Sequence, residues 1–286
     1  MQEWADLLKV LLAAAIMIRA SRQDWQERMA DDIHWKVIGL VGLALMALYV
    51  AQESLPWEYY LIIIATTVLF LDVFWDNEGM GRALSVSPYA FSLILLGYAI
   101  GSIGLDSLRY EMVTPFILYW VFVLLYILDV IKGGADAKCL ISLAMLFPLY
   151  PSIWMLPLID APSVAAQIVL PFPVMVLFLA SLMSLLVLPY FVVRNIMNRD
   201  LSMPQMLLGT RIPIERAESG HYWPMEAVSP DGSIVKRATP QGEGFEELRT
   251  AGAEVVWVTP KIPLLIPLTA AMLLLIILGN PLFLLI

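Results

Sequence analysis

The chain has 286 residues, of which 60% are hydrophobic and 15% charged, and its mean hydropathy is +0.79. Ordinary soluble domains carry roughly 45–50% apolar and about 25% charged residues, so the composition indicates a membrane protein. The formal net charge of −8 argues against nucleic acid as a partner, because nucleic-acid-binding proteins usually carry a basic patch. A single cysteine, Cys139, excludes a disulfide within the chain, and two distant histidines argue against a zinc site. We therefore expect no metal and no cofactor.

Apolar runs recur along the chain at the length of about 17–20 residues that a bilayer core of roughly 30 Å requires. They predict eight crossings, the first of which we interpret as a retained helix because it lacks the cleavage site of a signal peptide. The predicted crossings are 4–20, 36–52, 58–75, 87–104, 113–131, 139–158, 169–193 and 262–284. The sixth contains Pro148, Pro151 and Pro157, so we expect it to be kinked or broken.

The lysine and arginine residues predict the orientation in the membrane. If the connection 21–35 is cytoplasmic and the crossings alternate, almost all cations fall on the cytoplasmic side. Arg109 falls on the outer side, and Lys9 lies inside the first crossing. The pattern predicts a multi-pass protein of the cytoplasmic membrane with both termini outside and the lipid bilayer as its surroundings.

Residues 195–260 form the one long polar segment. Turn-forming residues separate short β-prone runs at 211–214, 233–235 and 254–258, which favours a small α+β lobe; a mobile cytoplasmic loop is the alternative. The fold class is then an all-α polytopic membrane protein of about eight transmembrane helices, with a small α+β cytoplasmic lobe before the last helix. The predicted domains are 1–194, the transmembrane catalytic region, 195–260, the lobe, and 261–286, the final helix.

Two acidic residues, Asp24 and Asp136, stand at helix ends that the predicted topology brings to the same cytoplasmic side. Asp136 lies in Lys132-Gly-Gly-Ala-Asp-Ala-Lys138, where small residues permit close backbone approach and positive φ. Two neighbouring carboxyl groups share a proton, so one can activate water while the other polarises a carbonyl. A helix cap or a solvated aspartate is the alternative for either residue alone.

Three segments carry a resemblance to a known family. They are ASRQDWQERMADDIHW (20–35), GGADAKCLISLAMLFP (133–148), and LPYFVVRNIMN (188–198) together with VVWVTPKIPLLIPLT (255–269). In this order they resemble the archaeal preflagellin and prepilin peptidases, a branch of the GxGD membrane aspartyl proteases.

The resemblance implies an aspartic-type endopeptidase that removes the short basic leader of preflagellins or type IV prepilin-like proteins at the cytoplasmic membrane face. Asp24 and Asp136 match the catalytic positions. The residues that match the supporting loop and its surroundings are Gly133, Gly134, Ala135, Lys138 and Arg28.

The chain departs from the family's pattern in two ways. Ala135 stands where the motif has glycine, and the long interval between the two aspartates implies an additional helical pair within 58–112. With one cysteine, we do not expect the methyltransferase activity of bacterial relatives. Acidic residues near the site are expected to attract a basic leader: Glu27, Asp31, Asp32, Asp76 and Glu78.

Two other functions remain open from the sequence. One is a proton-coupled membrane transporter that uses Asp72 and Asp129 as carriers. The other is a non-catalytic scaffold for the assembly of a pilus or flagellum.

Overall fold

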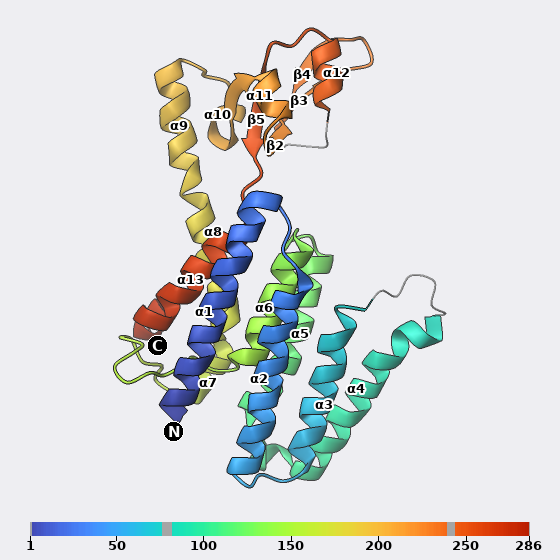
Figure 1. Cartoon of the computed structure of the whole chain (residues 1–286), viewed down its shortest axis with the longest axis vertical. Helices are drawn as coiled ribbons and strands as arrows, with labels where there is room; N and C mark the ends of the chain where they lie inside the picture. The colour runs from blue at the N-terminus through green and yellow to red at the C-terminus, as the bar shows by residue number, and fades with distance from the viewer. Residues whose placement is uncertain (1, 76–81, 239–243, 286) are drawn as a thin grey trace. The chain divides into compact units, whose positions relative to one another are not determined.

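The computed structural model describes residues 2–75, 82–238 and 244–285. The chain is mostly helical and packs as two units (Figure 1). One unit, here called the helical unit, comprises Met1–Ala180 and Leu264–Ile286, and the other, the lobe unit, comprises Ser181–Pro263. These units are defined by packing, whereas the domains 1–194, 195–260 and 261–286 were defined by function and stay a prediction.

The helical unit contains a bundle in which the last helix of the chain returns to the first. Its elements are α1 (Gln2–Glu27), α2 (Asp32–Gln52), α3 (Glu58–Asp72), α4 (Arg82–Ile103), η1 (Leu105–Ser107), α5 (Tyr110–Ile127), α6 (Gly134–Leu146), α7 (Val164–Val169), α13 (Leu265–Leu278) and η2 (Pro281–Leu284). Helix α8 (Phe172–Leu185) runs from the helical unit into the lobe unit. The range 58–112, where an additional helical pair is expected, contains α3 and α4.

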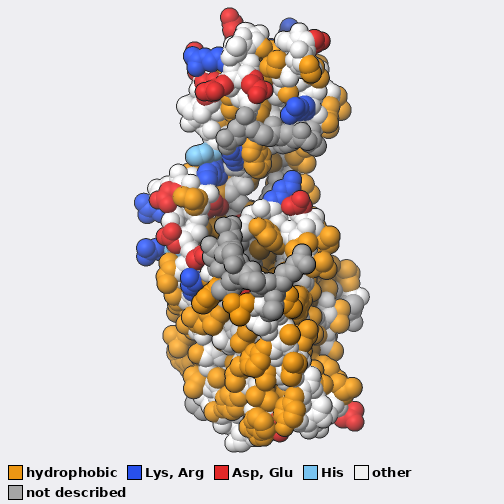
Figure 2. All heavy atoms as spheres, turned by 90° about the vertical axis from the view of Figure 1, so that its right-hand side faces the viewer, with side chains coloured by type: hydrophobic (Ala, Val, Ile, Leu, Met, Phe, Trp, Pro, Cys, Tyr) orange, Lys and Arg blue, Asp and Glu red, His pale blue; other side chains and the backbone are white. Residues whose placement is uncertain are grey.

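Among the described residues, four helices are long and apolar enough to cross a membrane: Asp32–Gln52, Leu84–Ile103, Tyr110–Ile127 and Phe172–Asn198. They coincide with four of the eight predicted crossings, and apolar side chains cover most of the visible face of the helical unit (Figure 2). The other four predicted crossings are not confirmed as spans. Two of them contain helices of 13 and 14 residues, α6 and α13.

The sixth predicted crossing is interrupted where its prolines begin. Helix α6 ends at Leu146, two residues before Pro148, and the chain then continues without a long helix to α7. Proline lacks the N–H that a helix needs and disfavours helical backbone in the residue before it. The expected break is therefore confirmed, and it leaves α6 as a short buried helix.

Two glycines of α2 allow its neighbours to approach closely. A Cβ atom at Gly42 would lie 2.5 Å from the backbone carbonyl of Met145 in α6. A Cβ atom at Gly39 would overlap the ring of Phe70 in α3. Small residues permit such backbone contact between membrane helices. Helix α2 is thus held between α3 and α6.

The lobe unit has its own sheet and core. Its elements are α9 (Val187–Asn198), α10 (Gln205–Leu208), β1 (Thr210–Pro213), α11 (Ile214–Glu218), β2 (Tyr222–Pro224), β3 (Glu226–Val228), β4 (Ile234–Lys236), α12 (Phe245–Thr250) and β5 (Val255–Pro260). An antiparallel sheet has the order β1-β5-β2, and β3 pairs with β4. The buried core consists of Ile212, Ile214, Ala217, Leu248, Val256 and Val258. Three of the strands lie at the predicted β-prone runs, so the α+β interpretation of this segment is confirmed over the loop alternative.

Replacement of Gly42 tests the contact between α2 and α6. Because the added methyl group of Gly42→Ala must displace the α6 backbone, we expect it to lower the free energy of unfolding by about 1–3 kcal/mol. Gly97→Ala in α4 is the matched control, because a Cβ atom at Gly97 would meet no described atom within 4 Å. It should leave stability unchanged or raise it by about 0.5–1 kcal/mol. Equal effects of the two substitutions in detergent-solubilised protein would contradict the close packing.

Candidate active site

Asp136 lies at the amino end of α6, outside the predicted crossing 139–158. Helix α6 begins at Gly134, with Gly133 as its N-cap, and Asp136 is its third residue. A Cβ atom at Gly133 would overlap the Asp136 carboxyl, whereas the nearest atom to a Cβ at Gly134 is the Tyr126 hydroxyl oxygen at 3.9 Å. The side chain of Asp136 therefore folds back over Gly133 and needs a residue without a side chain there.

Gly133 makes room for the Asp136 side chain, and its backbone is not left-handed. Gly133 has φ −91° and ψ 124°, an extended conformation open to any residue. Ala135 is the second residue of α6, where alanine is the best helix former. Of the two properties that small residues permit here, positive φ and close approach, Gly133 uses the second. The departure from the motif at Ala135 costs nothing in backbone conformation.

Asp24 lies in the last turn of α1, beyond the predicted crossing 4–20, and is fixed against the start of α13. Ser21 donates a hydrogen bond to the Leu265 carbonyl oxygen at 2.9 Å and lies 2.7 Å from the Thr269 hydroxyl oxygen. The backbone N–H of Leu265 donates to the Asp24 carboxylate. A carboxylate at a helix amino end is favoured by the exposed N–H groups and by the helix dipole.

The surroundings of the two carboxyl groups differ. Burial, followed by the charge of Asp24, raises the pKa of Asp136 from 3.8 to about 7. Burial also raises the pKa of Asp24, but there the Arg28 charge and the Leu265 N–H act in the opposite direction. The two groups are thus close enough for one charge to act on the other. The proton is held more firmly by Asp136, which has no such counteracting partner among the described residues.

Arg28 ends α1 and stays next to Asp24. Its backbone N–H donates to the Asp24 carbonyl oxygen at 3.0 Å, and its φ of 57° is left-handed. The guanidinium lies over the Trp25 ring, 5.5 Å from the centroid. Its Nε and Nη1 atoms are buried and have no hydrogen-bond partner among the described residues. These N–H groups can therefore donate hydrogen bonds to a bound molecule.

Lys138, the last of the predicted loop residues, forms an ion pair with Asp32. Its Nζ donates to Asp32 Oδ1 at 2.7 Å, so Asp32 is engaged within the protein. Two other acidic residues, Glu27 and Asp31, each accept a hydrogen bond from Gln23 at 3.1 Å. The remaining acidic residues that were expected to attract a basic leader, Asp76 and Glu78, lie outside the described residues.

The proposed transporter carriers lie elsewhere. Asp72 ends α3 and accepts a 2.5 Å hydrogen bond from the Tyr89 hydroxyl of α4, and Asp129 is exposed after α5. Neither belongs to the arrangement around Asp24 and Asp136. The described residues contain no group of three or more His, Cys, Asp or Glu side chains suited to a metal ion.

Sequence reasoning did not identify Ser21, Leu265 or Thr269 as neighbours of the site. They meet across more than 240 residues of chain. A hydroxyl in an apolar helix was the only signal, and it does not specify a partner.

A family model described as Archaeal Peptidase A24 C-terminus Type II matches residues 202–280. This match supports the archaeal prepilin and preflagellin peptidase family for the chain. It agrees with the resemblance of the three sequence segments and supports a peptidase in a membrane. A search of the curated proteins found no match. The matched range contains neither Asp24 nor Asp136, so their roles stay predictions.

Gly133 and Gly134 provide a matched pair of substitutions. Gly133→Ala should displace the Asp136 carboxyl and lower peptidase activity, because a misplacement of about 1 Å can reduce a rate roughly 100-fold. Gly134→Ala adds the same methyl group one residue later, where it meets nothing closer than 3.9 Å, and should retain activity. Cleavage assays on both variants at equal protein amounts test this. Full activity in Gly133→Ala would contradict the described position of the carboxyl.

The raised pKa of Asp136 has a consequence for stability. Between pH 3.8 and about 7 the folded protein holds this proton and the unfolded chain does not, so stability falls as pH rises through that window. Asp136→Asn carries no titrating group. The melting temperature of Asp136→Asn should be close to that of the wild type near pH 3.8. Above about pH 7 it should be a few degrees higher than that of the wild type. A difference that does not change with pH would contradict the burial of Asp136.

Proposed function

We propose that this chain is a membrane aspartyl endopeptidase that uses Asp24 and Asp136 as a catalytic dyad. It removes the short basic leader of preflagellins or type IV prepilin-like proteins at the cytoplasmic membrane face. The observation that supports this most directly is the pair itself: the charge of Asp24 acts on Asp136, and burial together with that charge raises the pKa of Asp136 to about 7. Such a pair supplies both a base and an acid for peptide hydrolysis.

The surroundings suggest which carboxyl group has which role. Asp24, as the anion supported by Leu265 and Arg28, takes a proton from water. The oxygen of that water attacks the scissile carbonyl carbon, while the protonated Asp136 gives its proton to the carbonyl oxygen. The resulting tetrahedral intermediate collapses as the C–N bond breaks. The proton on Asp24 passes to the leaving nitrogen, and Asp136 recovers its proton from the intermediate's hydroxyl group.

Charge at the site is compatible with a basic leader. Glu27 and Asp31 are exposed and accept hydrogen bonds from a neutral amide, so their negative charges are not neutralised by the cations described in ion pairs. Exposed charges of one sign raise the local concentration of an oppositely charged segment. The buried N–H groups of Arg28 would then bind a carbonyl oxygen of the same substrate.

The positive-inside pattern underlies the proposed location. It assigns the connection 21–35 and the loop 132–138 to the cytoplasmic side, with both termini outside. The functional domains follow from this: the region 1–194 carries both aspartates, 195–260 is the cytoplasmic lobe, and 261–286 is the final membrane helix.

No observation among the described residues favours the transporter. Asp72 is bound to Tyr89 and thereby joins α3 to α4, which accounts for an acidic residue at that position without a transported proton. A non-catalytic scaffold would have the same structure as the peptidase. Only an assay for cleavage distinguishes the two.

Substitution of each aspartate tests the dyad. Asp24→Asn and Asp136→Asn should each lower cleavage of a preflagellin-type substrate by on the order of 10²–10⁴-fold, because each removes a general acid or base. Asp129→Asn, at an exposed position after α5, is the control that should retain activity. All three proteins are compared in vesicles at equal amounts by following the release of the leader.

Three results would overturn the proposal. Robust cleavage by either active-site variant would exclude the dyad. Flux across proteoliposomes that depends on Asp72 or Asp129, in a protein that does not cleave the substrate, would favour the transporter. Wild-type protein that binds the substrate and never cuts it would favour the scaffold.

A further inference from the structure

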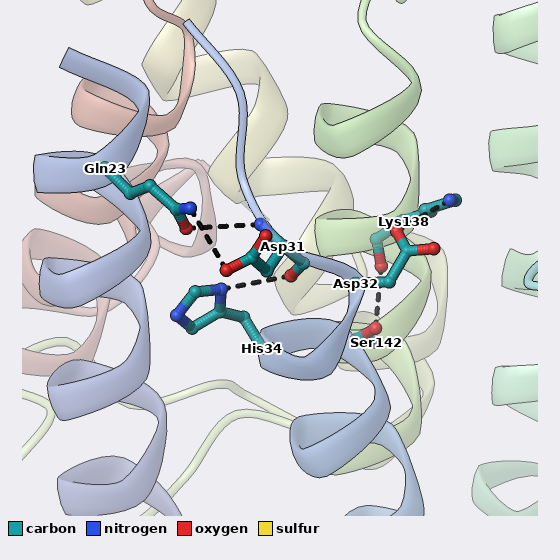
Figure 3. Close-up of polar contacts among 6 residues, drawn as sticks. All are labelled: Gln23, Asp31, Asp32, His34, Lys138 and Ser142. Carbon is teal, nitrogen blue, oxygen red and sulfur yellow. Dashed lines mark hydrogen bonds and ion pairs between the residues drawn. The ribbon is translucent and has the colours of Figure 1, made fainter. Parts of the chain in front are cut away.

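Two sets of side-chain contacts, one at Asp31 and one at the next residue, Asp32, connect the segments that carry the two aspartates (Figure 3). Gln23, next to Asp24 in α1, exchanges two hydrogen bonds with Asp31: its amide nitrogen donates to the carboxylate at 3.1 Å, and its oxygen accepts from the backbone N–H at 3.2 Å. Asp32 follows and begins α2. It accepts the 2.7 Å ion pair from Lys138, which stands two residues after Asp136 in α6.

The place of Lys138 in its own helix requires an explanation. It lies in the first turn and a half of α6, where the helix dipole disfavours a cation. Asp32 occupies the first turn of α2, where the dipole favours an anion. The attraction to Asp32 therefore offsets the unfavourable interaction of Lys138 with the dipole of α6. The ion pair also holds the amino ends of α2 and α6 together.

A second contact restricts the ammonium group of Lys138. Its Nζ lies 5.3 Å from the centroid of the Phe74 ring, just after α3, and Lys36 of α2 faces the same ring at 5.2 Å. A cation is attracted to the face of an aromatic ring at this distance. Lys138 is thus held by both α2 and the segment that follows α3. Ser142, one turn later, donates to the Lys138 carbonyl oxygen at 2.7 Å.

We propose that Asp32 and Lys138 are positioning residues whose ion pair fixes the start of α6, and with it Asp136, relative to the α1–α2 turn that follows Asp24. Neither touches the reacting atoms. The inference rests on the proposed peptidase function and adds to it a cause for the relative placement of the two carboxyl groups.

The partial exposure of the pair distinguishes positioning from general stability. The side chains of Lys138 and Asp32 are 26% and 40% exposed. Ion pairs at such partly exposed positions typically contribute little to the stability of the fold. The close contact between Gly42 and Met145 holds α2 and α6 together independently of it. Loss of the ion pair should therefore leave the fold intact and change only the placement of the α6 start.

Four variants test the inference in vesicle-reconstituted, full-length protein with a preflagellin-type peptide as the probe. Lys138→Met and Asp32→Ala should each lower kcat by about tenfold or more with little change in KM, since a small misplacement of a reacting group acts on the chemical step. The double variant should be no worse than either single one, because both remove the same interaction. Lys138→Arg keeps the cation and should retain most of kcat.

Lys132→Met is the matched control, since Lys132 is an exposed cation in the same connection. It should leave kcat and the melting temperature at wild-type values. Wild-type kcat in Lys138→Met would overturn the positioning role, as would additive losses in the double variant. A fall in melting temperature with unchanged kcat per folded molecule would assign the pair to stability alone. Failure of the peptidase proposal is distinct: it would appear as a wild type that does not cut, or as an active Asp24→Asn.

Discussion

Two carboxyl groups that lie close together in partly buried surroundings raise the free energy of the folded state. Contacts elsewhere in the helical unit must offset this. Burial disfavours the charged form of Asp136, and the charge of Asp24 disfavours it further. Left free to move, such groups would separate or turn toward water. Asp136 is instead fixed to a short, buried α6, and α6 contacts α2 backbone to backbone at Gly42. Asp24 is fixed to α1, which is tied to α13 by Ser21 and Thr269.

The sequence singles out the two aspartates and assigns both to the cytoplasmic side, because both predictions depend on short-range patterns; the catalytic role and the side of the membrane stay predictions. A small-residue loop before a helix and the distribution of cations are local signals. The break at Pro148 was predictable for the same reason: the physical effect of proline on helix backbone is confined to its neighbours. The strands of the lobe followed from alternation and turn residues. Small residues in the loop 132–138 permit both positive φ and close approach, and composition cannot distinguish the two; at Gly133 the structure uses close approach.

The contacts that give the site its geometry could not be predicted in this way. Ser21 meets Leu265 across 244 residues, and Lys138 meets Asp32 across 106. Neither partner carries a local pattern that names the other, since a hydroxyl or an ion at a helix end has many possible partners. The count of crossings met a similar limit. Apolarity predicts that a segment avoids water but does not set the length of its helix; α6 and α13 are shorter than the four candidate spans, so the crossings that contain them stay predictions.

The family match and the candidate site concern different parts of the sequence, and α13 joins them. The match covers residues 202–280 and leaves out both aspartates. It includes Leu265 and Thr269, whose backbone and hydroxyl groups contact the end of α1 around Ser21 and Asp24. The amino end of α13 supplies an N–H to the Asp24 carboxylate and so favours the anion that a general base requires. The matched C-terminal segment therefore contributes to the candidate site as well as forming the lobe. Its last helix helps to set the difference in proton affinity between Asp24 and Asp136, on which the proposed chemistry depends.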